Sequence, residues 1–110
     1  MKRGNWLRFA LFLAVFIPVA CQQMPIDQAA PKLTPTPESG IPAMKLDAGR
    51  EVYVSRQKCA GCHSPKPVFE YTAERWTNKI LPGMGLKAKL NPDDYAAVLA
   101  YVTTGAKAVK

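Results

Sequence analysis

The chain has 110 residues, with 15 Lys and Arg against 8 Asp and Glu, one His, three Cys and ten Pro. This length allows one small domain and excludes a multi-domain enzyme or a polytopic membrane protein. The single His excludes a metal site that takes two His from this chain. Three Cys is an odd number, so at least one Cys has a role outside an intramolecular pair.

Residues 1–20 have the pattern of a secretory signal peptide. The start is positive through three cations, Lys2, Arg3 and Arg8. The apolar run over residues 9–20 is shorter than the roughly 20 residues that a spanning helix needs, which favours a removable signal over a membrane anchor. The alternative is an uncleaved, tilted anchor that also uses Trp6 and Leu7.

Cys21 follows the apolar run directly, and the Ala20-Cys21 pair resembles the cleavage site of bacterial lipoprotein signals. Pro18 departs from that pattern, because an aliphatic residue is usual three positions before the Cys. The resemblance implies acyl chains on Cys21, an envelope location facing the periplasm and, because Gln22 rather than Asp follows, the outer membrane. The alternative is an unmodified Cys in a signal cleaved slightly later.

Removal of residues 1–20 leaves twelve cations and eight acids, a net charge of +4. This charge is too small to indicate nucleic-acid binding, and we expect none. Residues 21–45 read as a lipid-anchored tether, because half of the prolines lie there and no helical or strand period appears. Fully extended, such a Pro-rich tether reaches roughly 70 Å at ~3.1 Å per residue.

The composition changes near Leu46, so we expect the folded domain over residues 46–110. Three helices are predicted. The first covers residues 48–58, with Asp47 as its N-cap. The second covers residues 73–81, with Thr72 as its N-cap, and Pro82-Gly83 ends it. The third starts at the Asn91 cap with Pro92 in the first helical position and ends at Gly105. No alternating strand pattern appears, so the fold class is all-α.

The string Cys59-Ala60-Gly61-Cys62-His63 carries the chemistry of this chain. It is the C-x-x-C-H signature of covalent haem attachment, in which two thiols add to two vinyl groups and the next imidazole reaches the iron. A folded unit of about 60 residues is also marginal alone and gains from a prosthetic group. We therefore predict one covalently attached haem c, held by Cys59 and Cys62 and ligated by His63.

Other roles for the motif find less support in the sequence. A redox C-x-x-C belongs on a thioredoxin-like βαβ unit, and no strand pattern is present. A structural zinc site needs four ligands, and the remaining Cys lies beyond the tether. A Cys59–Cys62 disulfide leaves His63 without a role.

Residues 46–106 resemble the class I c-type cytochromes. The resemblance rests on Gly49 and Tyr53 before the motif, the CAGCH string, a downstream Met and a terminal helix containing Val98-Leu99-Ala100-Tyr101. It implies a small cytochrome c fold of about three helices around one haem, in which Gly49 packs near Val98 and Tyr101.

The second axial ligand is predicted to be Met84, which lies between two glycines downstream of the motif. In the resembled family the distal Met precedes the last helix, and the glycines would allow a tight loop near the haem. Met84 as a core filler is the alternative, and Lys87 or Lys89 could ligate only after losing a proton. His/Met ligation raises the reduction potential and leaves no open iron position.

The predicted function is electron transfer between envelope redox partners by a monohaem cytochrome that is not an enzyme. The alternatives are a haem sensor or peroxidase-like protein with a labile Met84, a haem subunit of a larger oxidoreductase complex, and a structural lipoprotein. Residues 56–89 carry a net charge of +5, so we expect redox partners with an acidic docking face. Its cations are Arg56, Lys58, Lys66, Arg75, Lys79, Lys87 and Lys89. The sequence does not define the oligomeric state.

Overall fold

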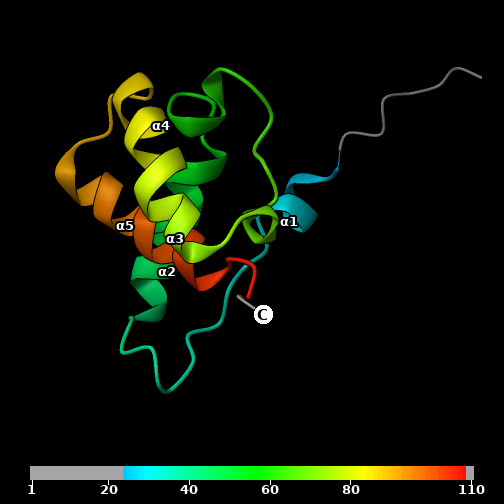
Figure 1. Ribbon diagram of the computed structural model, residues 1–110, viewed down its shortest axis with the longest axis vertical. Helices are drawn as coiled ribbons and strands as arrows, with labels where there is room; N and C mark the ends of the chain where they lie inside the picture. Colours follow the sequence, from blue (N-terminus) through cyan, green and yellow to red (C-terminus); the bar gives the residue numbers. More distant parts are fainter. Residues whose placement is uncertain (1–23, 109–110) are drawn as a thin grey trace, which may run out of the picture.

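The computed structural model describes residues 24–108, and within this range the chain forms helices and turns with one isolated β-bridge, Thr72 to Lys107 (Figure 1). In chain order the elements are α1 (Ile26–Ala29), α2 (Ala43–Val54), η1 (Cys59–Gly61), η2 (Val68–Glu70), α3 (Ala73–Arg75), η3 (Trp76–Ile80), α4 (Leu81–Lys87) and α5 (Pro92–Thr104). The all-α class predicted from the sequence is therefore confirmed. In the described residues no helix has both the length and the apolar character needed to cross a bilayer.

Helix α2 starts and ends earlier than predicted. It begins at Ala43 after Pro42, which has extended backbone and no side-chain cap, so Asp47 lies inside the helix and does not cap it. The earlier start places Leu46 one turn before Gly49 on the buried face, where it is 1 % exposed. Burial of Leu46 accounts for the difference, because its packing outweighs the modest preference of Asp for a capping position.

The second predicted helix does not end at Pro82-Gly83. Instead α3, η3 and α4 follow one another without a break as far as Lys87. The η3 turn is π-helical, and the Leu81 N–H donates to the Trp76 carbonyl five residues back. A proline ring clashes with the carbonyl four residues before it in a regular α-helix, and the widened turn just before Pro82 relieves that clash.

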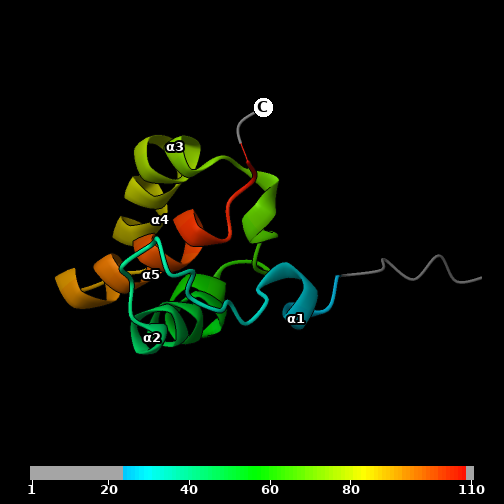
Figure 2. The same cartoon turned by 90° about the horizontal axis from the view of Figure 1, so that it is seen from below.

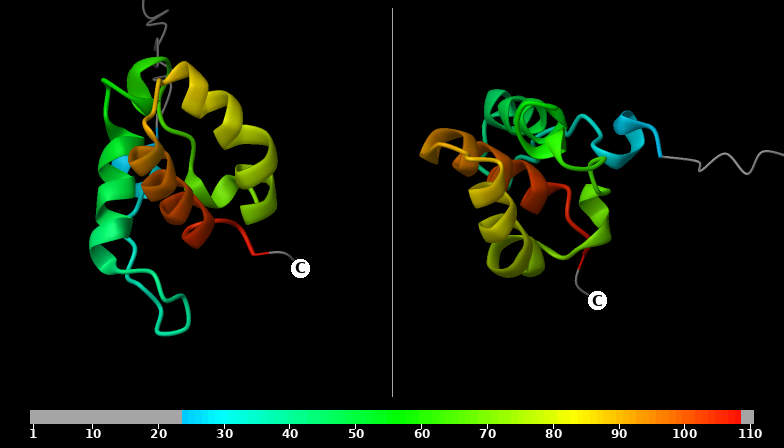
Figure 3. Two further views of the ribbon diagram at one scale, coloured as in Figure 1. Left: turned by 90° about the vertical axis from the view of Figure 1, so that its left-hand side faces the viewer. Right: turned by 90° about the horizontal axis from the view of Figure 1, so that it is seen from above.

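The predicted start of the last helix is confirmed. The Asn91 side chain accepts a hydrogen bond from the Asp94 N–H at 2.8 Å, Pro92 opens α5, and Gly105 follows its last residue. Helix α5 lies between α2 on one side and the α3–η3–α4 arm on the other (Figure 3). Both α2 and the α3–η3–α4 arm therefore pack against α5.

The core forms where α2 crosses α5. A Cβ added at Gly49 would lie 2.1 Å from the Ala97 carbonyl oxygen and 2.7 Å from the Tyr101 Cβ, so only glycine fits this crossing. The prediction that Gly49 meets the last helix near Tyr101 is confirmed. Beside the crossing, the Tyr53 ring packs edge-on against Trp76 with ring centroids 6.0 Å apart.

Residues 29–31 of the predicted tether pack on the domain, which differs from the expected free segment. Ala29 and Ala30 are 2 % and 0 % exposed. The Arg50 Nε donates to the Ala30 carbonyl at 2.7 Å, and the Tyr101 hydroxyl donates to the Pro31 carbonyl at 2.8 Å. Two buried small residues and two hydrogen bonds hold this stretch, a pattern that composition does not reveal. Figure 2 shows α1 beside the domain.

Candidate functional site

The C-x-x-C-H motif is formed by a tight turn directly after α2. The Ala60 N–H donates to the Ser55 carbonyl at 3.0 Å, and the Gly61 N–H donates to the Lys58 carbonyl at 3.3 Å. A Cβ at Gly61 would lie 2.6 Å from the Arg56 carbonyl oxygen. Gly61 is therefore required for the turn to close, a role that the sequence analysis did not assign.

The two cysteines of the motif lie in different surroundings. Both are free thiols; Cys59 is 7 % exposed, whereas Cys62 is exposed. Burial raises the pKa of the Cys59 thiol, and nearby Asp94 adds to the rise while Lys58 opposes it. The buried thiol is thus held in its neutral form near neutral pH.

The His63 ring is exposed, and a backbone carbonyl fixes its protonation. Its Nδ1 lies 2.8 Å from the Ser64 carbonyl oxygen, which can only accept a hydrogen bond. Nδ1 therefore carries the proton, and Nε2 keeps its lone pair for a metal. The residue next to His63 in the chain thus supplies the carbonyl that orients the ring.

Met84 lies on α4 rather than in the expected loop, because the helix continues through Pro82. A Cβ at Gly85 would lie 2.8 Å from the Tyr95 ring, so Gly85 lets α4 approach α5 closely. At Gly83 no atom lies within 4 Å of the corresponding position. Gly85 is therefore needed for the packing of α4 on α5, whereas the space beside Gly83 would accept a larger side chain.

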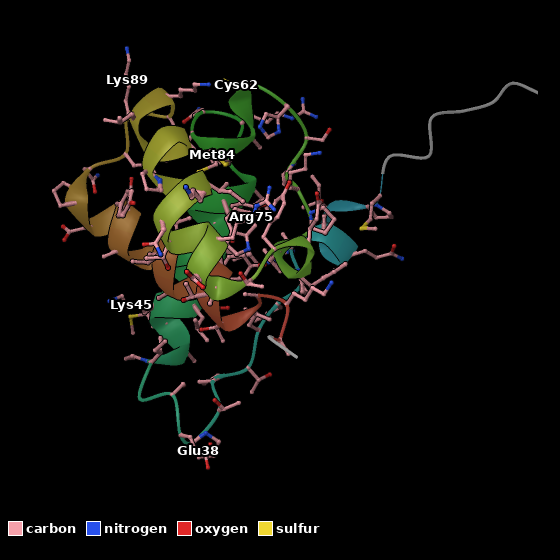
Figure 4. All side chains as sticks on the ribbon, viewed as in Figure 1. Glu38, Lys45, Cys62, Arg75, Met84 and Lys89 are labelled. Atoms are coloured by element: carbon pink, nitrogen blue, oxygen red, sulfur yellow. The ribbon has the colours of Figure 1, made fainter. Side chains whose placement is uncertain are left out.

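One cavity brings the four predicted haem residues together. Its volume is about 130 Å³. It is lined by Lys58, Cys59, Cys62, His63, Met84, Lys87 and Ala88. Figure 4 shows Cys62 and Met84 on neighbouring segments at one end of the molecule, with Lys89 at the same end. Met84 thus meets the motif at one site, although it lies 21 positions after His63 in the chain.

The cavity also has a cationic side. The Lys58 ammonium pairs with the Asp94 carboxylate, which ties the start of the motif to the first turn of α5. Lys87 lines the cavity, whereas Lys89 does not. Of the two lysines considered as alternative ligands, only Lys87 is therefore near the motif.

Two other residues whose side chains could ligate or hydrogen-bond a cofactor are not available to this site. Met44 is 82 % exposed at the start of α2 and does not line the cavity. The Trp76 Nε1 donates to the Val68 carbonyl at 2.8 Å, so its only donor is already used. Residues 1–20 and Cys21 lie outside the described residues, so the signal and the acylation site stay predictions.

Within residues 24–108, no three side chains among His, Cys, Asp and Glu gather closely enough to hold a bare metal ion. Comparison of the chain with known proteins gives no match to a protein family, a curated protein or a solved structure. The assignment of a function therefore depends on the residues and their arrangement.

Proposed function

We propose that this protein is a small monohaem c-type cytochrome that transfers electrons between redox partners in a bacterial envelope. The observation that carries the proposal is the shared cavity of Cys59, Cys62, His63 and Met84. Two thiols three residues apart, an imidazole and a thioether are the groups that a covalently bound, six-coordinate haem needs. The arrangement of α2, the motif turn and α5 around Gly49 agrees with a cytochrome c fold.

Each residue has a distinct task in this proposal. When bound, the haem supplies a centre that gains and loses one electron. The Cys59 and Cys62 sulfurs would hold the haem covalently, and the His63 Nε2 would ligate its iron. Met84 approaches from α4 with a soft thioether that favours ferrous iron. With His63 and Met84 both bound to the haem iron, the site would suit electron transfer rather than transformation of a substrate.

The size of the cavity adds a structural requirement. At about 130 Å³ it has room for roughly four water molecules, which is less than a porphyrin ring needs. A bound haem would therefore have to extend beyond this cavity.

The test is production of the full chain in a bacterium that exports and matures c-type cytochromes, followed by intact mass and visible spectra. We expect one haem retained after denaturation and a methionine–iron charge-transfer band in the oxidised protein. Cys59→Ser with Cys62→Ser should abolish covalent retention. A mature polypeptide that carries no covalent haem would overturn the proposal.

One observation favours the haem-sensor or peroxidase-like alternative enough to test it. His63 is exposed and Met84 is only half-buried, so a small molecule has a path to the cavity. Rapid binding of carbon monoxide to the ferrous protein would indicate a labile Met84. Absent or very slow binding supports electron transfer, because both axial positions then stay occupied.

The location and partners are part of the proposal. Cys21 is proposed to carry the lipid that keeps the protein at a membrane, facing the periplasm. Lys87 and Lys89 form no ion pair with any other described residue, so their charges are free to attract an acidic partner surface. Such a partner would dock at the end of the molecule that carries the cavity.

A further inference from the structure

The segment just after Cys21 is bound to the domain at three points. The Arg50 Nη2 lies 2.8 Å from the Asp27 carboxylate, and its Nε donates to the Ala30 carbonyl at 2.7 Å. The Tyr101 hydroxyl donates to the Pro31 carbonyl at 2.8 Å. Because Arg50 belongs to α2 and Tyr101 to α5, the segment is attached across both helices of the core crossing.

This attachment places the start of the described chain beside the haem motif. Met24, Ile26 and Ala29 line one side of a second cavity of about 370 Å³, and Arg56, Cys62 and His63 are among the residues on its other side. Figures 1 and 2 both show α1 next to the segment that follows the motif. Three residue steps separate Cys21 from Met24, which span at most about 11 Å.

An acyl group on Cys21 would therefore hold this face of the domain close to the membrane, whereas a free tether would let the domain move far from it. The composition of the face suits a lipid interface. Met24 and Ile26 are apolar and are 46 % and 47 % exposed, and the one acid of the face, Asp27, is paired with Arg50. Exposed Arg56 lies beside the face, across the second cavity, and adds a cation that anionic headgroups attract.

We propose that the face formed by residues 24–29 and 61–65 docks on a phospholipid surface, with Arg50 and Tyr101 fixing its orientation. The proposal depends on the acylation of Cys21 put forward above. In this orientation the haem motif lies at the membrane surface, and the electron-transfer partners must reach the protein there. Residues 32–42 then form a loop on the domain and do not act as a spacer.

The experiment uses the full chain, matured in an exporting bacterium and placed in vesicles of phosphatidylcholine and phosphatidylglycerol. Amide hydrogen exchange is compared with and without vesicles. We expect exchange at residues 24–29 and 61–65 to slow by about tenfold on vesicles, while residues of α3 exchange at an unchanged rate. Intact mass reports acylation in the same sample.

Two variants test what fixes the orientation. The double variant Arg50→Ala with Tyr101→Phe removes the attachment of residues 27–31 and should lose the vesicle-dependent protection at 61–65. The matched control is Arg75→Ala with Tyr71→Phe, another Arg–Tyr pair, in which the guanidinium lies 5.0 Å from the ring centroid. A flexible Gly/Ser insertion between Gln23 and Met24 disturbs no contact of the described residues and should also abolish the protection.

Each outcome has a separate meaning. A mass without acyl chains overturns the docking proposal together with the proposed location. It does not bear on the haem function, which the visible spectra test separately. Acylated protein without vesicle-dependent protection at 61–65 overturns the docking proposal alone. Protection that survives both the double variant and the insertion also overturns it, because the orientation would then not depend on the bound segment.

Discussion

Gly49 of α2 and Ala97 of α5 are so close that a Cβ on Gly49 would lie 2.1 Å from the Ala97 carbonyl oxygen. The atom in the way is backbone, so no side-chain rotation relieves the clash. The two helices would have to move apart, and the neighbouring contact between Tyr53 and Tyr101, with ring centroids 5.9 Å apart, would change with them.

We therefore expect Gly49→Ala to destabilise the protein by about 1–3 kcal/mol, measured by urea unfolding. Gly83→Ala is the matched control, because nothing lies within 4 Å of its added methyl and alanine favours a helix by about 1 kcal/mol. Equal effects of the two substitutions would contradict the helix crossing described here.

Met84→Ala should remove the proposed second axial ligand while leaving the proposed covalent haem in place. Loss of the thioether is expected to lower the reduction potential, on the order of 0.1 V within the ≈ 0.8 V range that axial ligands set, and to allow rapid carbon monoxide binding. Potentiometry and carbon monoxide kinetics measure both effects. Met44→Ala, at an exposed position outside the cavity, should change neither; a similar shift in both variants would count against Met84 as the ligand.

Lys87→Gln should slow association with the proposed acidic redox partner by about two- to fivefold at low ionic strength and reduce the salt dependence of the rate. Lys87 lines the cavity, and its charge is unpaired among the described residues. Lys45→Gln makes the same charge change well away from Cys62, at the start of α2 (Figure 4), and serves as the control. Stopped-flow kinetics at several salt concentrations give the comparison, and identical slopes for both variants would exclude steering toward the cavity end.

Alkaline pH should weaken the fold through Tyr101. Burial raises the pKa of Tyr101 to about 12, whereas an unfolded tyrosine titrates near 10. Above about pH 10 the unfolded chain loses this proton and the folded chain keeps it, so the free energy of unfolding falls as the pH rises toward 12. Urea midpoints measured across this range should fall, and they should fall less steeply in Tyr101→Phe, although that variant also loses its hydrogen bond to Pro31.

The local sequence was sufficient to predict the features that depend on neighbouring residues. The all-α class, the start of α5 at Asn91-Pro92 and its end at Gly105 follow from capping chemistry and periodicity within a few positions. Most of the candidate site could also be predicted from the sequence, because C-x-x-C-H places three of its residues within five positions. The meeting of Gly49 with Tyr101 was predicted from the family resemblance, and the structure agrees.

Only the tertiary structure showed where distant segments meet. Pro82 was expected to end a helix, but the π-helical turn at η3 admits it, and Met84 reaches the motif from a helix. Residues 26–31 have the composition of a free Pro-rich tether. In the structure Arg50 of α2 and Tyr101 of α5 donate hydrogen bonds to their backbone carbonyls and hold them on the domain. Propensity and composition report the preferences of a segment by itself, whereas burial and hydrogen bonds to remote residues are set when the helices pack, and these decide its final position.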